Sequence, residues 1–505
     1  MSFSITRSCH LLLFLWFFLA HPALGDKEIF SGYEVLARVA RSVRRSSSCA
    51  AAVGEQKGGW WPSTARRSDD PAYPHTRTKP GHQHGDDQLA WLTAHNRSAL
   101  VFDFEYPAIG IGNGLNGFIQ AASWAVVGGL PILLLEPSGE ATINSLCFVF
   151  ECGFPTVRRE LLFGPRAPFG QQKMVHVFPP TPTTAQFDLL HSRADKLFKV
   201  VSFKSNIRLH PCLNEAFYTS SKPCGKQNAK DAGICWQISV IRALLPRLSA
   251  RAHERLVSLP PSVFHGNFER VLQIAGAERS PSSSPPTPTH LPYFQAIHIR
   301  TLLPAIETYR TIQGAKAASL FRSNIEFLAN VSDLCTFDDR LLLSQHHSEV
   351  QQSTTQTRDV FIASDSLELK QLLSARWEAQ SANPWRLHYF VSPGARLRTR
   401  RATSVTDAML LTLVELWLLS RSRPLIAMAF FDIRLGEKSL SEESERSGGK
   451  LLFKTVSTFA KGASLLGGLG TATDFSQCAT IGSGSRATPI SRPINKDCSE
   501  ECSWI

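Results

Sequence analysis

The 505-residue chain has little that would mark it as a membrane, fibrous or disulfide-knot protein. Beyond its N-terminus it has no apolar run of about 18 residues or more, so a polytopic membrane protein is excluded. It has no internal repeat of fixed period, and its composition excludes the collagen, coiled-coil and small disulfide-knot classes. Charged residues make up only 19%, whereas hydrophobic residues make up 43%. The chain therefore has enough apolar material for large cores, and intrinsic disorder of the whole chain is excluded.

No Cys-x-x-Cys pair occurs among the 11 cysteines, which argues against a zinc site. Without Cys9 an even number remains, as expected for disulfides in an oxidising compartment, but their connectivity does not follow from the sequence. Lys plus Arg number 54 and Asp plus Glu 42, a net charge of +12 that favours anionic ligands or surfaces. The arginine-rich run at 396–401 lacks interleaved aromatic residues, so no nucleic-acid partner is expected.

The first 25 residues have the pattern of a signal peptide or signal anchor. Arg7 precedes the apolar run Leu11–Ala20, and small residues follow a break at His21 and Pro22. This pattern predicts the secretory pathway: the Golgi or endoplasmic reticulum lumen, or secretion. A membrane contact is expected only if the segment stays as an anchor. Two N-glycosylation sequons, which begin at Asn96 and Asn330, suit the same compartment.

Composition and patterning divide the rest of the chain. Residues 26–95 lack periodic pattern and are expected to form a flexible stem. A Pro/Ser-rich linker at 279–290 separates an N-terminal acceptor-side domain, 96–278, from a nucleotide-sugar-binding domain, 291–470, and a tail follows at 471–505. The length suits two or three domains of about 150 residues.

Strands and helices alternate in both halves. The first half shows a βαβ pattern, with a strand at Leu100–Phe104, a glycine-rich turn at Gly110–Gly114, a helix at Leu115–Val127 and a strand at Pro131–Leu135. In the second half the expected strands are 294–300, 360–363, 387–391 and 425–429, and the expected helices are 306–320, 367–376, 406–419 and a short one opened by Ser457. The fold class is therefore α/β, with parallel sheets.

The glycine-rich turn is the first motif that can carry chemistry. Glycines let the backbone approach a phosphate or sugar, and the following helix offers free N–H groups. Gly112, Gly114 and Gly117 also match the dinucleotide fingerprint GxGxxG, with Glu136 at the distance of a ribose-binding acid. A purely structural turn is the other interpretation.

Three further motifs follow predicted strands or begin a helix. His298 and Arg300 end one strand, where a guanidinium can bind a pyrophosphate or can form a surface ion pair. Asp365 ends another strand and can contact a base or ribose, or cap the next helix. The run from Ser457 to Phe459 begins a helix and suits a phosphate or a plain N-cap.

In their order, these four motifs resemble those of the fucosyltransferases, the group that contains α-1,2-, α-1,6- and protein O-fucosyltransferases. The resemblance covers roughly residues 98–136 and 292–468. It implies two Rossmann-like domains facing a cleft, the GT-B arrangement, with GDP-fucose as donor, a glycan or glycoprotein as acceptor and no obligatory metal. The implied activity is transfer of fucose to a glycan or protein hydroxyl with inversion.

The resemblance also assigns roles. Arg300 would bind the β-phosphate and assist departure of the leaving group, with His298 as its support. Asp365 and Ser366 would contact the guanosine. The residues that would hold the pyrophosphate, largely through backbone N–H groups, are Ser457, Thr458 and Phe459. Gly112 and Asn113 would line the cleft near the sugar.

Inverting transfer needs a general base, and Asp103 and Glu105, beside the glycine turn, are the candidates. Two positions depart from the family pattern: Leu303 stands where an acidic residue is common, and Gly114 where a larger polar residue is usual. These departures keep open a secreted, catalytically weakened glycan-binding pseudoenzyme. The dinucleotide fingerprint keeps open an NAD-dependent oxidoreductase.

Overall fold

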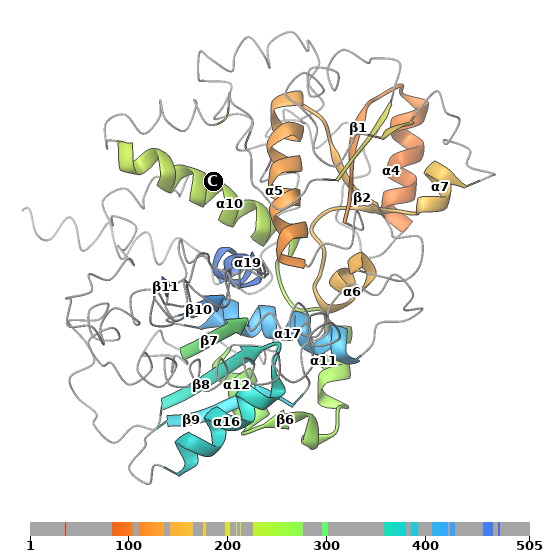
Figure 1. Cartoon of the computed structure of the whole chain (residues 1–505). Helices are drawn as coiled ribbons and strands as arrows, with labels where there is room; N and C mark the ends of the chain where they lie inside the picture. Colours follow the sequence, from red (N-terminus) through yellow and green to blue (C-terminus); the bar gives the residue numbers. More distant parts are fainter. Residues whose placement is uncertain are drawn as a thin grey trace, which may run out of the picture.

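The computed structural model contains two β-sheets with helices packed on both (Figure 1). It describes residues 36, 83–104, 111–135, 142–164, 175–177, 197–202, 209, 213, 226–275, 295–300, 358–379, 385–391, 407–422, 425–429, 458–467 and 473–474. The predicted helix at 306–320 lies outside these ranges, as do residues 1–25, the linker and most of the tail.

The first sheet has five strands in the order β3-β2-β1-β5-β4, and every pair is parallel. In sequence they are β1 (Ala99–Asp103), β2 (Ile132–Leu135), β3 (Thr156–Val157), β4 (Val175–Val177) and β5 (Phe198–Val201). Consecutive side chains of a strand point to opposite faces. Because both faces of β1 are covered, all five of its residues are buried.

Two sets of helices cover this sheet. On one face, α4 (Gln83–Ala94) and α7 (Arg159–Phe163) pack against β1 and β2 (Figure 1). On the other face lie α5 (Ile111–Gly128) and α6 (Thr142–Val149). α4 corrects the predicted flexible stem, which reached residue 95. Leu89 and Leu92 lie on one side of α4 and are fully buried against the sheet, and Leu36 is also buried in the core.

The second sheet has six strands in the order β11-β10-β7-β8-β9-β6. They are β6 (Phe264–His265), β7 (Gln295–Arg300), β8 (Arg358–Ser364), β9 (Trp385–Phe390), β10 (Leu425–Ala429) and β11 (Thr473–Asp474). All neighbouring strands run parallel except β6, which pairs antiparallel with β9. The sheet therefore includes two residues that precede the predicted linker, and the predicted boundary of the N-terminal domain at 278 needs correction. β6 belongs to the second sheet because its main chain completes the open edge of β9.

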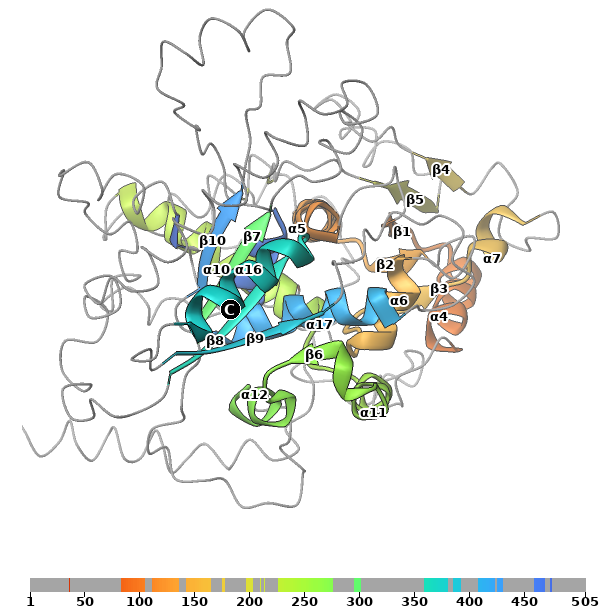
Figure 2. The same ribbon diagram turned by 60° about the horizontal axis from the view of Figure 1, so that its bottom comes forward.

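Helices also cover both faces of the second sheet. α16 (Leu367–Glu378) and α12 (Phe268–Ile274) lie on opposite sides of β8 and β9 (Figure 2). Three more helices pack near the middle of the molecule: α10 (Lys226–Leu244), α17 (Asp407–Arg421) and α19 (Thr458–Gly467). α11 (Ala250–Val257) and the 3₁₀ turn η2 (Pro261–Val263) lead into β6.

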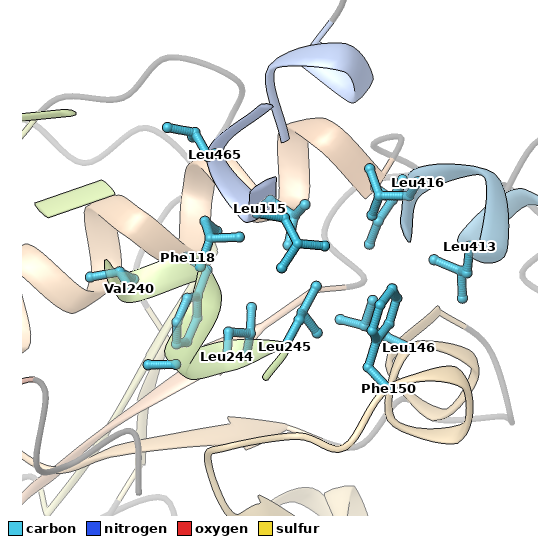
Figure 3. Close-up of a cluster of buried hydrophobic side chains, with 14 of the residues drawn as sticks. Leu115, Phe118, Leu146, Phe150, Val240, Leu244, Leu245, Leu413, Leu416 and Leu465 are labelled. Carbon is cyan, nitrogen blue, oxygen red and sulfur yellow. The ribbon is translucent and has the colours of Figure 1, made fainter. Parts of the chain in front are cut away.

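One apolar core joins the two sheets. Its side chains come from α5, α10, α17 and α19 and from the end of α6 (Figure 3): Leu115, Phe118, Leu146, Phe150, Val240, Leu244, Leu245, Leu413, Leu416 and Leu465. α19 packs closely at its middle and at its C-terminal end. A methyl group on Gly462 would lie 2.9 Å from a methyl carbon of Leu115, and one on Gly467 would collide with the backbone of Ser420. The two halves are therefore fixed through α19.

Three further findings bear on the sequence predictions. Cys147 and Cys152 form a disulfide, a pairing that the sequence left open. The expected α/β class with parallel sheets is confirmed. Within the described residues, no helix is both long and apolar enough to cross a membrane.

Candidate functional site

The four predicted motifs lie at strand ends and helix starts, as the alternation indicated. In an open parallel sheet, ligands bind beyond the carboxyl ends of the strands. β7 ends at Arg300 and β8 ends at Ser364, next to Asp365 and Ser366. α5 begins at Ile111, and α19 begins at Thr458. The candidate site is built from these ends.

The structure brings the glycine motif and the Ser-Thr-Phe motif into direct contact. A Cβ atom on Gly112 would collide with the backbone of Thr458 and Phe459. Only glycine permits such an approach of two main chains. The first turns of α5 and α19 therefore touch, although they come from opposite halves of the chain.

The residue at which α5 begins corrects one prediction from the sequence. Gly112 and Gly114 were predicted to form a turn before the helix, but α5 already begins at Ile111. Gly112 is needed for the approach to α19, and a Cβ atom on Gly114 would lie 3.0 Å from the Phe104 ring. Gly117 also lies within α5 and is buried. The three glycines of the dinucleotide fingerprint thus serve helix packing.

The two adjoining helix starts carry no acidic residue in their first turns. The first N–H groups of a helix have no intrahelical acceptor, and the helix dipole makes that end positive. Lys461, one turn into α19, adds a cation that has no ion-pair partner among the residues described. Burial lowers the pKa of its ammonium. The junction is therefore suited to an anion.

Three side chains lie at this junction. The ring of His298 is almost fully buried, with its centroid 5.4 Å from that of Phe459. Phe459 itself packs against the central core. The Oδ1 atom of Asn113 is buried and has no hydrogen-bond partner in the described part of the chain. It is an acceptor left for a ligand's hydroxyl or amide group.

Arg300 is the last residue of β7, two positions after His298, and it lies opposite Ala429 on β10. Its backbone therefore ends the strand beside the junction, and its side chain lies outside the described atoms. Glu105 and Ser457 also lie outside the described residues.

The turn after β8 is defined by Ser366, which is the N-cap of α16. Its Oγ accepts a hydrogen bond from the Leu369 N–H at 3.2 Å, and its own N–H donates to Ser364 Oγ at 3.1 Å. The sequence analysis named capping of the next helix as one of two roles open to Asp365. The N-cap is instead the following residue, Ser366. Asp365 precedes this cap and lies directly after the carboxyl end of β8.

The sequence analysis missed a buried ion pair next to this turn. Lys370, on α16, donates to Glu415 Oε1 at 3.0 Å and to the Phe390 carbonyl at 3.1 Å. The Lys370 side chain is 0% exposed and that of Glu415 is 6% exposed. Burial raises the pKa of Glu415, the attraction of Lys370 opposes the rise, and the charge of Asp365 adds to it. A lone glutamate within the apolar helix α17 was the signal available in the sequence.

Asp103, one of the two candidate bases, lies on the other side of β1. It is the last residue of that strand and forms an ion pair with Arg159 of α7 at 3.3 Å. This is the face that α4 and α7 cover, whereas α5 lies on the opposite face. The structure therefore brings Gly112, Asn113, His298, Thr458 and Phe459 together and leaves Asp103 apart from them.

Comparisons with known proteins give structural likeness only. No protein-family model and no curated protein matches the chain. In structure it is similar to a variant of Arabidopsis thaliana FUT1 in complex with GDP, at 11% identity over 75% of this chain and 70% of that one, with a TM-score of 0.42. It is also similar to the α-1,6-fucosyltransferase NodZ soaked with GDP-fucose, at 13% identity over 73% and 93%, with a TM-score of 0.34. At these values the likeness carries no argument about function, which must be argued from the residues.

Proposed function

We propose that the protein is a glycosyltransferase that transfers fucose from GDP-fucose to a hydroxyl of a glycan or protein, with inversion. The observation that carries the proposal is the contact between the first turns of α5 and α19. Neither turn contains an acid, Lys461 stands in the second, and the strand that ends in Arg300 adjoins them. A pyrophosphate fits this combination of free N–H groups and cations.

Each residue then has a chemical task. The α19 N-terminus, from Thr458 and Phe459, donates backbone N–H groups to the pyrophosphate. Arg300 neutralises the negative charge that develops on the departing GDP, which lowers the barrier because that charge is largest in the transition state. Asp365 accepts hydrogen bonds from the guanosine, beside Ser366. Asn113 accepts a hydrogen bond from a sugar hydroxyl through its Oδ1 atom.

The acceptor hydroxyl must lose a proton during inverting transfer. Asp103 and Glu105 remain the predicted bases. The ion pair with Arg159 occupies one oxygen of Asp103, so Glu105 is the stronger of the two. Asp103→Asn should then leave transfer activity within a few-fold of wild type, whereas Glu105→Gln should reduce kcat by about 10²-fold or more.

Calorimetry on the purified chain tests the donor. GDP and GDP-fucose should bind, NAD should not, and Arg300→Ala should weaken GDP binding at least tenfold. NAD binding that Arg300→Ala retains would instead favour the oxidoreductase. A folded chain that binds none of the three nucleotides would favour the glycan-binding pseudoenzyme that Leu303 suggests.

We also propose that the chain works in the lumen of the secretory pathway. Two observations support this location: the Cys147–Cys152 disulfide, and Asn96, an exposed sequon residue in a turn with φ of 50°. After expression in a eukaryotic secretory host, a peptide N-glycosidase should reduce the mass of the wild-type chain and change that of Asn96→Gln less. A wild-type mass that the glycosidase leaves unchanged would contradict the location.

A further inference from the structure

The Lys370–Glu415 ion pair lies where the second sheet meets the candidate donor site. Lys370 is in the first turn of α16, and its N–H donates to the carbonyl of Ser366 at 3.3 Å. The same residue reaches with its ammonium to the last carbonyl of β9, at Phe390, and to Glu415 on α17. One residue thus contacts all three elements: its backbone the turn after β8, and its side chain the end of β9 and α17.

The pair also acts electrostatically on the turn. Burial is the main cause that raises the pKa of Glu415, and the negative charge of Asp365 adds to the rise, since the two carboxylates are close enough to repel each other. The ammonium of Lys370 offsets the repulsion by attracting Glu415. An unbalanced carboxylate at position 415 would push Asp365 away from its place at the edge of the sheet.

A gain in stability does not explain the pair. Two charges removed from water lose their hydration, and well-packed apolar residues of similar volume stabilise a core as well or better. Both side chains are almost completely buried. A buried pair of this kind is expected where it fixes one geometry among several that apolar packing would allow.

We propose that Lys370 and Glu415 are positioning residues for donor binding, and that they hold the Asp365–Ser366 turn in the geometry that receives the nucleoside of the donor. This inference rests on the proposed function, because it assumes that the turn binds a nucleoside diphosphate. Neither residue touches the donor. Their effect passes through Ser366, whose carbonyl begins α16, and through the charge of Asp365.

The test replaces both charges at once, in the variant Lys370→Met/Glu415→Leu. Because it leaves no unpaired charge, its Tm should equal or exceed that of wild type. Its Kd for GDP, measured by calorimetry, should be higher by a factor on the order of 10 to 100, as expected for a binding group displaced by about 1 Å. An unchanged Kd in the folded variant would overturn the inference.

A double-mutant cycle tests whether the pair acts through Asp365. Asp365→Asn should weaken GDP binding strongly in the wild-type background and little in the apolar-pair background, since the carboxylate is already misplaced there. Additive effects would overturn the inference. If the apolar pair does not fold, Lys370→Arg is the second variant: it keeps the charge but moves it, so GDP should bind several-fold more weakly, and an unchanged Kd would count against the proposal.

Asp359→Asn provides the control, because Asp359 is a buried carboxylate at the opposite end of β8. It should lower the Tm and leave the Kd for GDP unchanged. Loss of GDP affinity in this control would mean that any destabilised sheet binds GDP poorly, which would overturn the specific role of Lys370 and Glu415. A wild-type chain that binds no GDP would overturn the donor proposal, and this inference with it.

Discussion

The two ends of the second sheet both bury charged groups, but they do so differently. At the amino end, Asp359 accepts hydrogen bonds from His388 Nε2 and from Arg270 Nε, both at 2.9 Å. At the carboxyl end, Glu415 receives the single ammonium of Lys370. Two donors on separate oxygens satisfy the first carboxylate more fully than one ammonium satisfies the second.

The pKa values of the two carboxylates move in opposite directions. Burial raises the pKa of Asp359, but the hydrogen bonds and charges of His388 and Arg270 outweigh it and hold the value below 3.8. Burial raises the pKa of Glu415 above 4.5, and Lys370 does not cancel the rise. The amino end is therefore organised for stability. The carboxyl end accepts an unfavourable charge, as binding sites often do.

The largest expected effect is loss of one partner at the carboxyl end. Lys370→Met would leave Glu415 buried without its cation, which should lower the free energy of unfolding by about 3–5 kcal/mol. Arg270→Met, at the amino end, should lower the free energy of unfolding by less, because His388 still donates to Asp359 and the Arg270 side chain is 38% exposed. Urea denaturation of both variants measures the difference, and equal losses would contradict the distinction between the two ends.

The next largest effect is that of Asp359→Asn, which should lower the free energy of unfolding by about 1–3 kcal/mol at neutral pH. Because the native pKa of Asp359 is lowered, the stabilisation of the folded chain by its carboxylate is complete above about pH 4. This stabilisation is lost as the pH falls through the native pKa. The variant should therefore lose less stability than wild type on acidification. Denaturation curves between pH 7 and pH 3 provide the measurement. Parallel curves for the two proteins would be inconsistent with this assignment.

Glu415 should show the opposite pH dependence. A carboxyl with a raised native pKa binds more protons in the folded chain, so wild-type stability should fall as the pH rises from about 4.5 through the native pKa. Lys370→Met/Glu415→Leu should lack this fall. The same denaturation series measures it, with Asp359→Asn as the matched variant from the other end of the sheet.

An effect of similar size is expected at the helix junction on the carboxyl side. Gly112→Ala adds a methyl group that collides with the backbone of Thr458, and overpacking of this kind costs about 1–3 kcal/mol. Because α19 must move, GDP binding should weaken as well. Gly233→Ala is the control, since a Cβ there meets nothing within 4 Å. Calorimetry measures the Kd for GDP of both variants. A loss of affinity in Gly233→Ala alone would contradict the proposed role of the junction in binding GDP.

The smallest effect is that of Lys461→Met. Removal of a partly buried ammonium that lacks an ion-pair partner among the described residues should leave the Tm unchanged or slightly higher. The affinity for GDP should fall a few-fold, because the cation no longer faces a phosphate. The loss should diminish at high salt, which calorimetry at two ionic strengths can detect.

Short buried strands could be predicted closely from the sequence. The predicted strand at 425–429 is β10, and that at 294–300 differs from β7 by one residue. β10 is a continuous apolar run, as expected where helices cover both faces of a parallel sheet, and β7 has the apolar residues Ala296, Ile297 and Ile299.

Features that depend on contacts between residues distant in the sequence could not be predicted. The start of α5 was misplaced because Gly112 disfavours a helix locally, and its close packing against Thr458 is a contact distant in the sequence. α4 was missed because only a few of its residues, such as Leu89 and Leu92, are buried. Lys370 and Glu415 are far apart in the sequence, so no local pattern links them.

The antiparallel strand β6 has a consequence for dividing the chain. Because Phe264 and His265 cover the edge of β9, a fragment that starts after the linker would expose the main chain of β9 to other molecules. Exposed strand edges recruit further strands, so such a fragment should aggregate, whereas one that starts before α11 would keep its edge covered. The second unit therefore begins before β6, on the N-terminal side of the Pro/Ser-rich segment.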